Sequence, residues 1–213
     1  MRNRAFSLLE VLIALAIVGL ILVAMNAFVF SMGELWGRNA DVRLFDQHVR
    51  AVTRFMQSEL REAVLPPYAA ANATPIGIQQ ITPANGAQDN LITFELTAGS
   101  RMLTWPDHPL PEVVCSLQVR DGEGLILLWH SRLEVNFNSD APREVVITPF
   151  VSAMTYDYFD TDFNRWTTET ILRKDSNGNT LAPQRLRLTF TYGKMHRESL
   201  IALATTPQGL PNP

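Results

Sequence analysis

The feature that most constrains this chain is an apolar run close to its N-terminus. From Phe6 to Phe30 the sequence reads FSLLEVLIALAIVGLILVAMNAFVF, with Glu10 as the single charged residue of the run. A helix needs about 20 apolar residues to cross the hydrocarbon core of a bilayer. The run is apolar on every face, whereas a helix that packs on one side of a soluble core is amphipathic. We therefore predict a transmembrane helix over residues 6–30.

The residues around the run favour a retained anchor over a cleaved secretory signal. Arg2 and Arg4 precede the run, which predicts that Met1 faces the cytoplasm and that the rest of the chain lies on the other side. A secretory signal also has a basic start, but its apolar stretch covers roughly 7–15 residues and a small-residue cleavage site follows it. Here the stretch is longer, and Asn26 to Ser31 lack such a site.

Glu10 is the residue that a plain membrane anchor does not need. A carboxylate at the bilayer centre costs about 2.5–3.5 kcal/mol on insertion scales and less near the interface. The neighbouring Leu, Ile and Val residues offset this cost. Two interpretations remain open: Glu10 lies solvated at the headgroup level, or it pairs with a positive charge. The nearest such charge would be a newly formed amino terminus.

The N-terminal segment resembles the cleavage and methylation segment of type IV pilins and type II secretion pseudopilins. A short basic leader, a Phe, a Ser, two leucines, a Glu and a long apolar run stand in one register. The resemblance implies that a membrane prepilin peptidase cuts between Ala5 and Phe6, and that Phe6 becomes the N-methylated first residue. It maps Glu10 to the acidic position of the family. Ala5 departs from the pattern, because the family normally has Gly before the cut.

Cleavage at that position would give Glu10 a partner. The new amine would lie four residues before Glu10 in the sequence, so it could bond the carboxylate within one subunit. In an assembly it could instead pair with Glu10 of a neighbouring subunit. In a low-dielectric environment such a pair is strong enough to set the axial register between subunits, because an unpaired charge is costly there.

A second helical segment follows the apolar run. Its apolar residues recur at steps of three or four, which predicts an amphipathic helix: Val42, Phe45, Val49, Val52, Met56, Leu60 and Ala63. Arg and Glu residues lie between them, and Pro66 and Pro67 end the helix. We expect this helix, over residues 31–65, to pack on a soluble domain as part of its scaffold.

The remainder of the chain has the period of β-strands. Residues 66–90 are rich in Ala, Pro, Asn, Gln and Gly, and we expect an irregular connection there. From Leu91 onward apolar and polar residues alternate in stretches that begin near residues 91, 113, 154, 186 and 198. The predicted fold class is α+β, with a long N-terminal helix packed on an antiparallel β-sheet domain, as in pseudopilins. The expected division is a leader (1–5), a transmembrane helix (6–30), an amphipathic helix (31–65), the connection (66–90), a periplasmic β domain (91–206) and a tail (207–213).

The soluble half resembles one branch of the family, the J-class minor pseudopilins. Residues 49–64 and 150–203 follow the order of a helix, a strand, a turn, a Trp, a Pro and an alternating strand. The resemblance implies a bacterial inner-membrane protein with one span, a cytoplasmic N-terminus and a periplasmic domain. Its implied partners are the prepilin peptidase and the I-, K- and major G-class pseudopilins. Together they form a pseudopilus tip that helps to export folded proteins.

Motifs for catalysis, nucleic-acid binding or cofactor binding do not stand out. The 18 basic and 21 acidic residues give a net charge of −3, which argues against a broadly basic nucleic-acid binder. No nucleophile motif, HExxH sequence or phosphate-binding loop occurs. We therefore predict no enzyme activity, no catalytic residues and no cofactor. Cys115 lies on the apolar side of its strand, so we expect a small buried hydrophobe.

One weak metal candidate remains. Asp160, Asp162 and Asn164 resemble the start of an EF-hand loop, but Arg165 replaces its Gly and Ile171 stands in place of the bidentate Glu. We favour a solvated turn over a calcium site at these residues. The cluster Asp175, Asn177 and Asn179 is better interpreted as a hairpin tip. Trp105, Trp129 and Trp166 could anchor an interface, but core or edge packing is the favoured interpretation.

Three functional hypotheses follow from the sequence. The first is a J-like minor pseudopilin of a type II secretion system, which assembles and has no activity of its own. The second is a minor pilin of a type IV pilus. The third is a signal-anchored periplasmic enzyme or binding module. The basic leader and the position of Glu10 argue against the third hypothesis, because a plain anchor needs neither.

Overall fold

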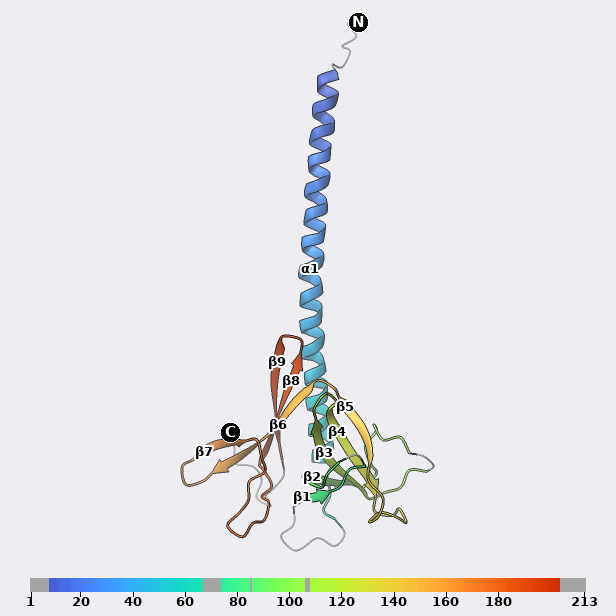
Figure 1. Ribbon diagram of the computed structural model, residues 1–213, viewed down its shortest axis with the longest axis vertical. Helices are drawn as coiled ribbons and strands as arrows, with labels where there is room; N and C mark the ends of the chain where they lie inside the picture. The colour runs from blue at the N-terminus through green and yellow to red at the C-terminus, as the bar shows by residue number, and fades with distance from the viewer. Residues whose placement is uncertain (1–7, 67–73, 85, 106–107, 204–213) are drawn as a thin grey trace. The chain divides into compact units, whose positions relative to one another are not determined.

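A computed structural model of the protein describes residues 8–66, 74–84, 86–105 and 108–203, with residues 34–39 described by their backbone alone (Figure 1). Within these described residues, one helix is followed by nine strands. The chain divides into two compact units, residues 1–46 and 47–213. Helix α1 (Leu8–Arg61) runs through the boundary between them, and each unit is described by itself below.

The first unit consists, in its described part, of the N-terminal portion of α1. The span Leu8–Gly33 is long and apolar enough to cross a membrane, and none of it is buried. Large apolar side chains on all sides of this helix are exposed, including Leu12, Ile17 and Leu20. An apolar surface of this kind is unfavourable in water and favourable in lipid. The expected N-terminal apolar helix is therefore confirmed.

The second unit begins with the last turns of α1, which pack into the β domain. Four members of the apolar stripe are buried in this unit, namely Val49, Val52, Met56 and Leu60, and Ala63 is half-buried. Two side-chain hydrogen bonds tie the same segment to the strands. Thr53 Oγ1 lies 2.7 Å from Ser199 Oγ, and His48 Nε2 lies 2.8 Å from Thr148 Oγ1. The expected role of the stripe as scaffold agrees with this packing.

The helix ends earlier than its predicted bound of residue 65. α1 stops at Arg61, and the backbone N–H of Val64 donates to the carbonyl of Glu95 at 2.9 Å. Val64 and Glu95 form an isolated antiparallel bridge. The residue before a proline also disfavours the helical conformation, and Leu65 precedes Pro66. Pairing with a strand and the following proline therefore take the chain out of the helix.

The first sheet has five antiparallel strands in sequential order. They are β1 (Ile76–Ile81), β2 (Asp89–Leu96), β3 (Val113–Arg120), β4 (Gly124–Ser131) and β5 (Arg143–Thr148). On one face Phe94, Cys115 and Trp129 stand in register on β2, β3 and β4, and all three are buried. On the other face Thr93 and Ser116 form a buried hydrogen bond of 2.8 Å.

The second sheet has four antiparallel strands in the order β7-β6-β8-β9. Its members are β6 (Val151–Asp160), β7 (Arg165–Glu169), β8 (Arg185–Tyr192) and β9 (Met195–Ala202). Leu186, Leu188 and Phe190 of β8 are buried, whereas the residues between them are half-buried. This alternation is the two-residue period that identified the strand in the sequence.

The α+β class is confirmed, with two differences in detail. The strands form two sheets, a division that the alternating pattern alone does not specify. The segment 66–90 is not irregular throughout, because β1 lies within it. The sequence of β1 is IGIQQI, in which two glutamines and a glycine interrupt the apolar pattern, so the sequence does not indicate a strand there. Backbone pairing with β2 over Ile76 to Ile81 supplies the stabilisation that local propensity does not.

Candidate functional site

Glu10 is the one predicted processing or assembly residue that the structure describes. It lies in the first turn of α1 and is exposed among exposed apolar side chains. A carboxylate in the first turn interacts favourably with the partial positive charge of a helix N-terminus. Ala5 and Phe6 lie outside the described residues, so their assignment as the processing site stays a prediction. The same holds for the role of Glu10 in assembly.

The weak calcium candidates form the turn between β6 and β7. The Asp160 carboxylate accepts hydrogen bonds from the backbone N–H groups of Asp162 at 3.1 Å and Phe163 at 3.2 Å. Asn164 closes the turn with a φ of 48°. Among the residues that the structure describes, no group of three or more His, Cys, Asp or Glu side chains could hold a metal ion. The Asp160 carboxylate thus has a local role in stabilising the turn.

The second acidic cluster is a hairpin tip. Lys174 and Thr180 form an isolated antiparallel bridge, and Asp175 accepts hydrogen bonds from the backbone N–H groups of Asn177 and Asn179, each at 2.8 Å. Hydrogen bonds from the side chain and then the backbone of Asn179 lower the pKa of Asp175. The carboxylate is therefore used within the turn.

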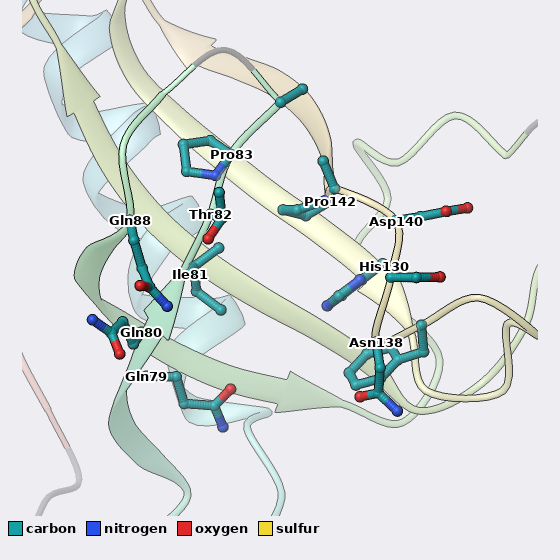
Figure 2. Close-up of a pocket in the computed structure, with 14 residues that line it drawn as sticks. Gln79, Gln80, Ile81, Thr82, Pro83, Gln88, His130, Asn138, Asp140 and Pro142 are labelled. Atoms are coloured by element: carbon teal, nitrogen blue, oxygen red, sulfur yellow. The ribbon is translucent and has the colours of Figure 1, made fainter.

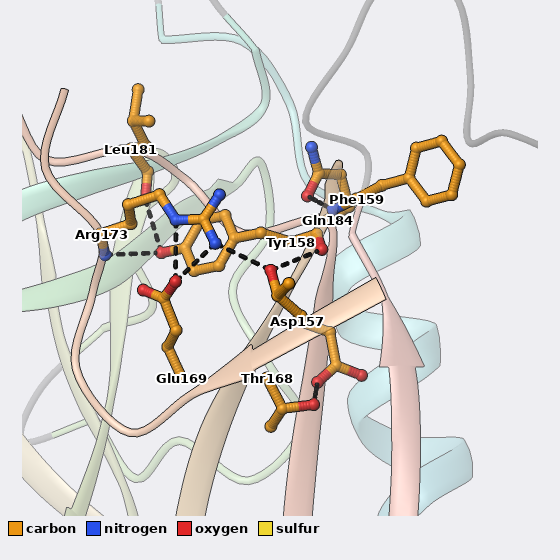
Figure 3. A network of polar contacts seen from close by, with 9 residues as sticks. Asp157, Tyr158, Phe159, Thr168, Glu169, Arg173, Leu181 and Gln184 are labelled. Atoms are coloured by element: carbon orange, nitrogen blue, oxygen red, sulfur yellow. Dashed lines mark hydrogen bonds and ion pairs between the residues drawn. The ribbon is translucent and has the colours of Figure 1, made fainter. Parts of the chain in front are cut away.

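A polar network ties the segment after β7 to strand β6 (Figure 3). The Tyr158 hydroxyl donates to the carbonyl of Leu181 at 3.1 Å and accepts from the backbone N–H of Arg173 at 3.0 Å. The Arg173 guanidinium lies 4.5 Å from the centroid of the Tyr158 ring and donates from Nε to Glu169 at 2.9 Å. Burial raises the pKa of Tyr158, and the hydrogen bond to Glu169 raises that of Arg173. The hydroxyl is therefore held protonated at neutral pH, as a structural donor.

Asp157 belongs to a second polar group of the same sheet. Its buried carboxylate accepts from Thr168 Oγ1 at 2.7 Å and from Arg187 Nη2 at 3.0 Å. Arg187 also donates to the exposed Glu198 at 2.9 Å. The pKa of Arg187 is raised, most by the hydrogen bond to Glu198 and further by that to Asp157. Nothing in this group resembles a nucleophile and base pair, because the Asp157 carboxylate is held by Thr168 and Arg187, and the buried Arg187 Nε has no hydrogen-bond partner within the described part of the chain.

Aromatic residues and the single cysteine serve packing. Trp129 is buried, and its ring lies 4.8 Å from that of Trp105. Trp166 is half-buried on β7 and lies under the guanidinium of Arg185, 3.7 Å from its ring centroid. Cys115 is buried, as expected, and burial raises the pKa of its thiol. A protonated, inaccessible thiol is a poor nucleophile.

Sequence reasoning missed a polar pocket on the five-stranded sheet (Figure 2). Residues 79–84, Gln88, His130 and residues 137–142 line a volume of about 610 Å³. Three separate stretches of the sequence contribute to it, and only strand pairing brings them together. No motif in any one stretch indicates the pocket, so sequence spacing offered no signal for it.

Comparison with known proteins identifies the N-terminal segment. The family model described as the prokaryotic N-terminal methylation motif matches residues 1–26. Searches of curated proteins and of solved structures find no match. The matched segment contains Ala5, Phe6 and Glu10 and extends into the apolar helix. The motif indicates a pilin-like N-terminal segment, and the apolar helix supports a membrane-anchored protein with a single span.

Proposed function

We propose, from the methylation motif and the α+β architecture, that this chain is a minor pseudopilin of a type II secretion system. In this proposal it is a structural subunit of the pseudopilus tip, helps to initiate assembly and supports export of folded proteins. The observation that carries the proposal is the match of the methylation motif to residues 1–26, with Glu10 in the first turn of a helix that is exposed and apolar over Leu8–Gly33.

Each part of the N-terminal segment has a defined role in this proposal. Arg2 and Arg4 hold the leader in the cytoplasm, where a prepilin peptidase cuts between Ala5 and Phe6. The peptide bond is hydrolysed, and the amine of Phe6 is then methylated. The charged amine pairs with Glu10 of a neighbouring subunit and sets the axial register between them. The domain that follows the span lies in the periplasm, where it contacts other pseudopilins.

The order of elements in the β domain supports the J-like assignment. The last turns of α1 pack with the domain, and the chain then follows the expected order: strand β6, a turn, a Trp in β7, a Pro and the alternating strand β8. Trp166 stands at the start of β7, and Pro183 precedes β8. We propose the I-, K- and G-class pseudopilins as its partners on this pattern.

The first test is the intact mass and N-terminal sequence of the membrane-extracted protein, from cells with and without prepilin peptidase. We expect a chain that starts at methylated Phe6 only when the peptidase is present. An Ala5→Gly variant should be processed at least as completely as the unmodified chain. A chain that keeps Met1 in both cells, or that is cut after the apolar run, would contradict the pilin-like class.

A second test addresses assembly. Glu10→Gln removes the charge while keeping the size of the side chain, so it should be processed but recovered poorly in sheared pseudopili. Asp41→Asn is a matched control, because Asp41 is an exposed acidic residue of α1 outside the apolar span. Co-purification with I- and K-class subunits supports a secretion pseudopilus. Co-purification with type IV pilus subunits alone supports the second functional hypothesis instead.

A further inference from the structure

The pocket of Figure 2 lies across one face of the five-stranded sheet. One side is formed by the end of β1 and the segment after it, residues 79–84 and Gln88. The other side is formed by residues 137–142, which connect β4 to β5, with His130 of β4. In the sheet, β2 and β3 separate β1 from β4. The pocket therefore spans the width of several strands.

Its floor is apolar and fixed. Ile81 lines the pocket and packs against a buried cluster of Leu91, Ile126 and Leu128. These residues come from β1, β2 and β4, whose backbones are held by strand pairing. A surface built on paired strands keeps its shape better than one carried on loops alone.

An imidazole and an aromatic ring form one wall. The ring of His130 lies 4.1 Å from that of Phe137, with 32° between their planes. Burial is the main cause that lowers the pKa of His130, so the imidazole is neutral at pH 7, with one donor and one acceptor nitrogen. Neither nitrogen bonds another side chain or backbone group among the described residues. Figure 2 shows the ring directed toward the space between the two sides.

Neutral polar groups surround this wall and floor. Three carboxamides line the pocket, those of Gln79, Gln88 and Asn138, whereas the amide of Gln80 lies on the opposite side of β1 from Gln79 (Figure 2). None of them makes a hydrogen bond within the described parts of the chain, although each can donate two and accept two. Hydroxyls are present as well, on Thr82 and Ser139. The lining thus offers many donors and acceptors without charge.

The charges of the lining residues indicate which class of ligand the pocket can hold. Asp140 is the single charged side chain among the lining residues, and in Figure 2 its carboxylate points away from Thr82 and Gln88. No Lys or Arg is among the lining residues that the structure describes, and Arg132, whose guanidinium lies 5.5 Å from the Phe137 ring centroid, is paired with Glu95. One carboxylate does not hold a divalent ion. An apolar ligand would leave the carboxamides unpaired. A ligand that is neutral, rich in hydroxyl groups and apolar on one face fits all of these groups.

We propose that this pocket binds a neutral saccharide. The hydroxyl groups of the sugar pair with the carboxamides and with His130, and its C–H face packs on Ile81. A volume of about 610 Å³ lies within the range of roughly 300–1,000 Å³ that is typical of small-molecule pockets, and it accommodates one or two sugar rings. The proposal does not depend on the assignment as a minor pseudopilin.

Saturation-transfer NMR on the full chain in lipid nanodiscs tests the proposal, since no sugar-based detergent is then present. The probes are maltose, cellobiose, lactose and chitobiose, with citrate as an anionic comparison and triglycine as a peptide comparison. We expect transfer to at least one disaccharide and none to citrate or triglycine. Gln79→Ala and Asn138→Ala change exposed side chains, so folding is preserved. Each should weaken binding about fivefold, as the loss of one hydrogen bond of about 1 kcal/mol predicts.

Gln47→Ala is the matched control, because Gln47 is an exposed carboxamide on α1 and does not line the pocket. Its affinity for the disaccharide should equal that of the unmodified chain. The proposal is overturned if no disaccharide shows transfer, if binding survives unchanged in both pocket variants, or if triglycine binds in place of the sugars. The Phe6 and Glu10 experiments are independent of this result.

Discussion

Asp157 is a buried charged residue whose contacts serve the packing of a sheet and not an active site. Its carboxylate is enclosed by Thr168 and Arg187, and its own carbonyl accepts the N–H of Gln184 at 3.1 Å. In the sequence it appears as one of the polar residues that alternate with Tyr156 and Tyr158, which suggests a solvated face. The contacts of β7 and β8 bury it instead. Alternation predicted the strand correctly, but not which polar side chains neighbouring strands would enclose.

Replacing Asp157 tests this enclosure. We expect Asp157→Ala to lower the free energy of unfolding by about 2–4 kcal/mol, because Arg187 loses its buried partner and Thr168 its acceptor. Glu198→Gln is the control, since Glu198 is the exposed partner of the same arginine and is worth at most about 1 kcal/mol. Urea denaturation of both variants measures the difference. Equal losses of unfolding free energy in the two variants would show that burial of the Asp157 carboxylate has no effect on stability.

Cys115 gives a second prediction at this scale. Its side chain is fully buried between Phe94 and Trp129, and burial raises the pKa of the thiol. A thiol reagent should therefore not label the folded protein between pH 7 and pH 9, and labelling should appear only with denaturant. Because Cys115 is the single cysteine of the chain, the labelled fraction reports unfolding directly. Rapid labelling of the folded protein would contradict the burial.

Among the elements, the turn from β3 to β4 requires glycine at two positions, and the local sequence indicates only one of them. The Asp121-Gly122 pair is typical of a hairpin turn, and the structure has this turn between Arg120 and Gly124. Gly122 and Gly124 both have positive φ, at 75° and 89°. An added Cβ would meet open space at Gly122, but at Gly124 it would meet the carbonyl oxygen of Thr148 and the backbone of Pro149. Position 124 therefore requires a glycine because the backbone at the end of β5 approaches it closely, and β5 follows much later in the chain.

These two glycines form a matched pair of substitutions. Gly122→Ala should cost about 1–2 kcal/mol in unfolding free energy, from the strain of a positive φ alone. Gly124→Ala should cost at least about 2 kcal/mol more, because the backbone of the next strand must also move. Thermal unfolding followed by circular dichroism compares the two. If the two alanine variants lose the same unfolding free energy, the close approach of Thr148 does not restrict the side chain at position 124.

For the molecule as a whole, the sequence predicted the apolar helix, the scaffold stripe and the antiparallel β class. Each of these depends on a local period of apolar residues, and such a period can be read without knowing the fold. The two sheets, strand β1 and the pocket depend on pairings between distant segments, such as Ile81 with Asp89. The glutamines that line the pocket resemble ordinary solvated residues in the sequence, so the pocket could not be predicted.

The proposed orientation in the membrane can be tested on whole cells. We expect protease added to spheroplasts to digest the β domain, and intact cells to protect it, because the outer membrane excludes the protease. Replacing Arg2 and Arg4 with Glu removes the positive charges before the span, so a smaller fraction should be digested. Protection of the domain in spheroplasts that carry the unmodified chain would place it in the cytoplasm.

The last turns of α1 also have a mechanical consequence. From Gln47 to Arg61 the helix buries four side chains in the β domain and bonds Ser199 through Thr53. Tension applied to the chain at Gln47 acts along this helix, so all four buried contacts and the hydrogen bond resist it together in shear. Edge strand β9 would instead separate from β8 one pair at a time if it were pulled from its end. The domain is therefore expected to withstand more force through its N-terminal helix than through its last strand.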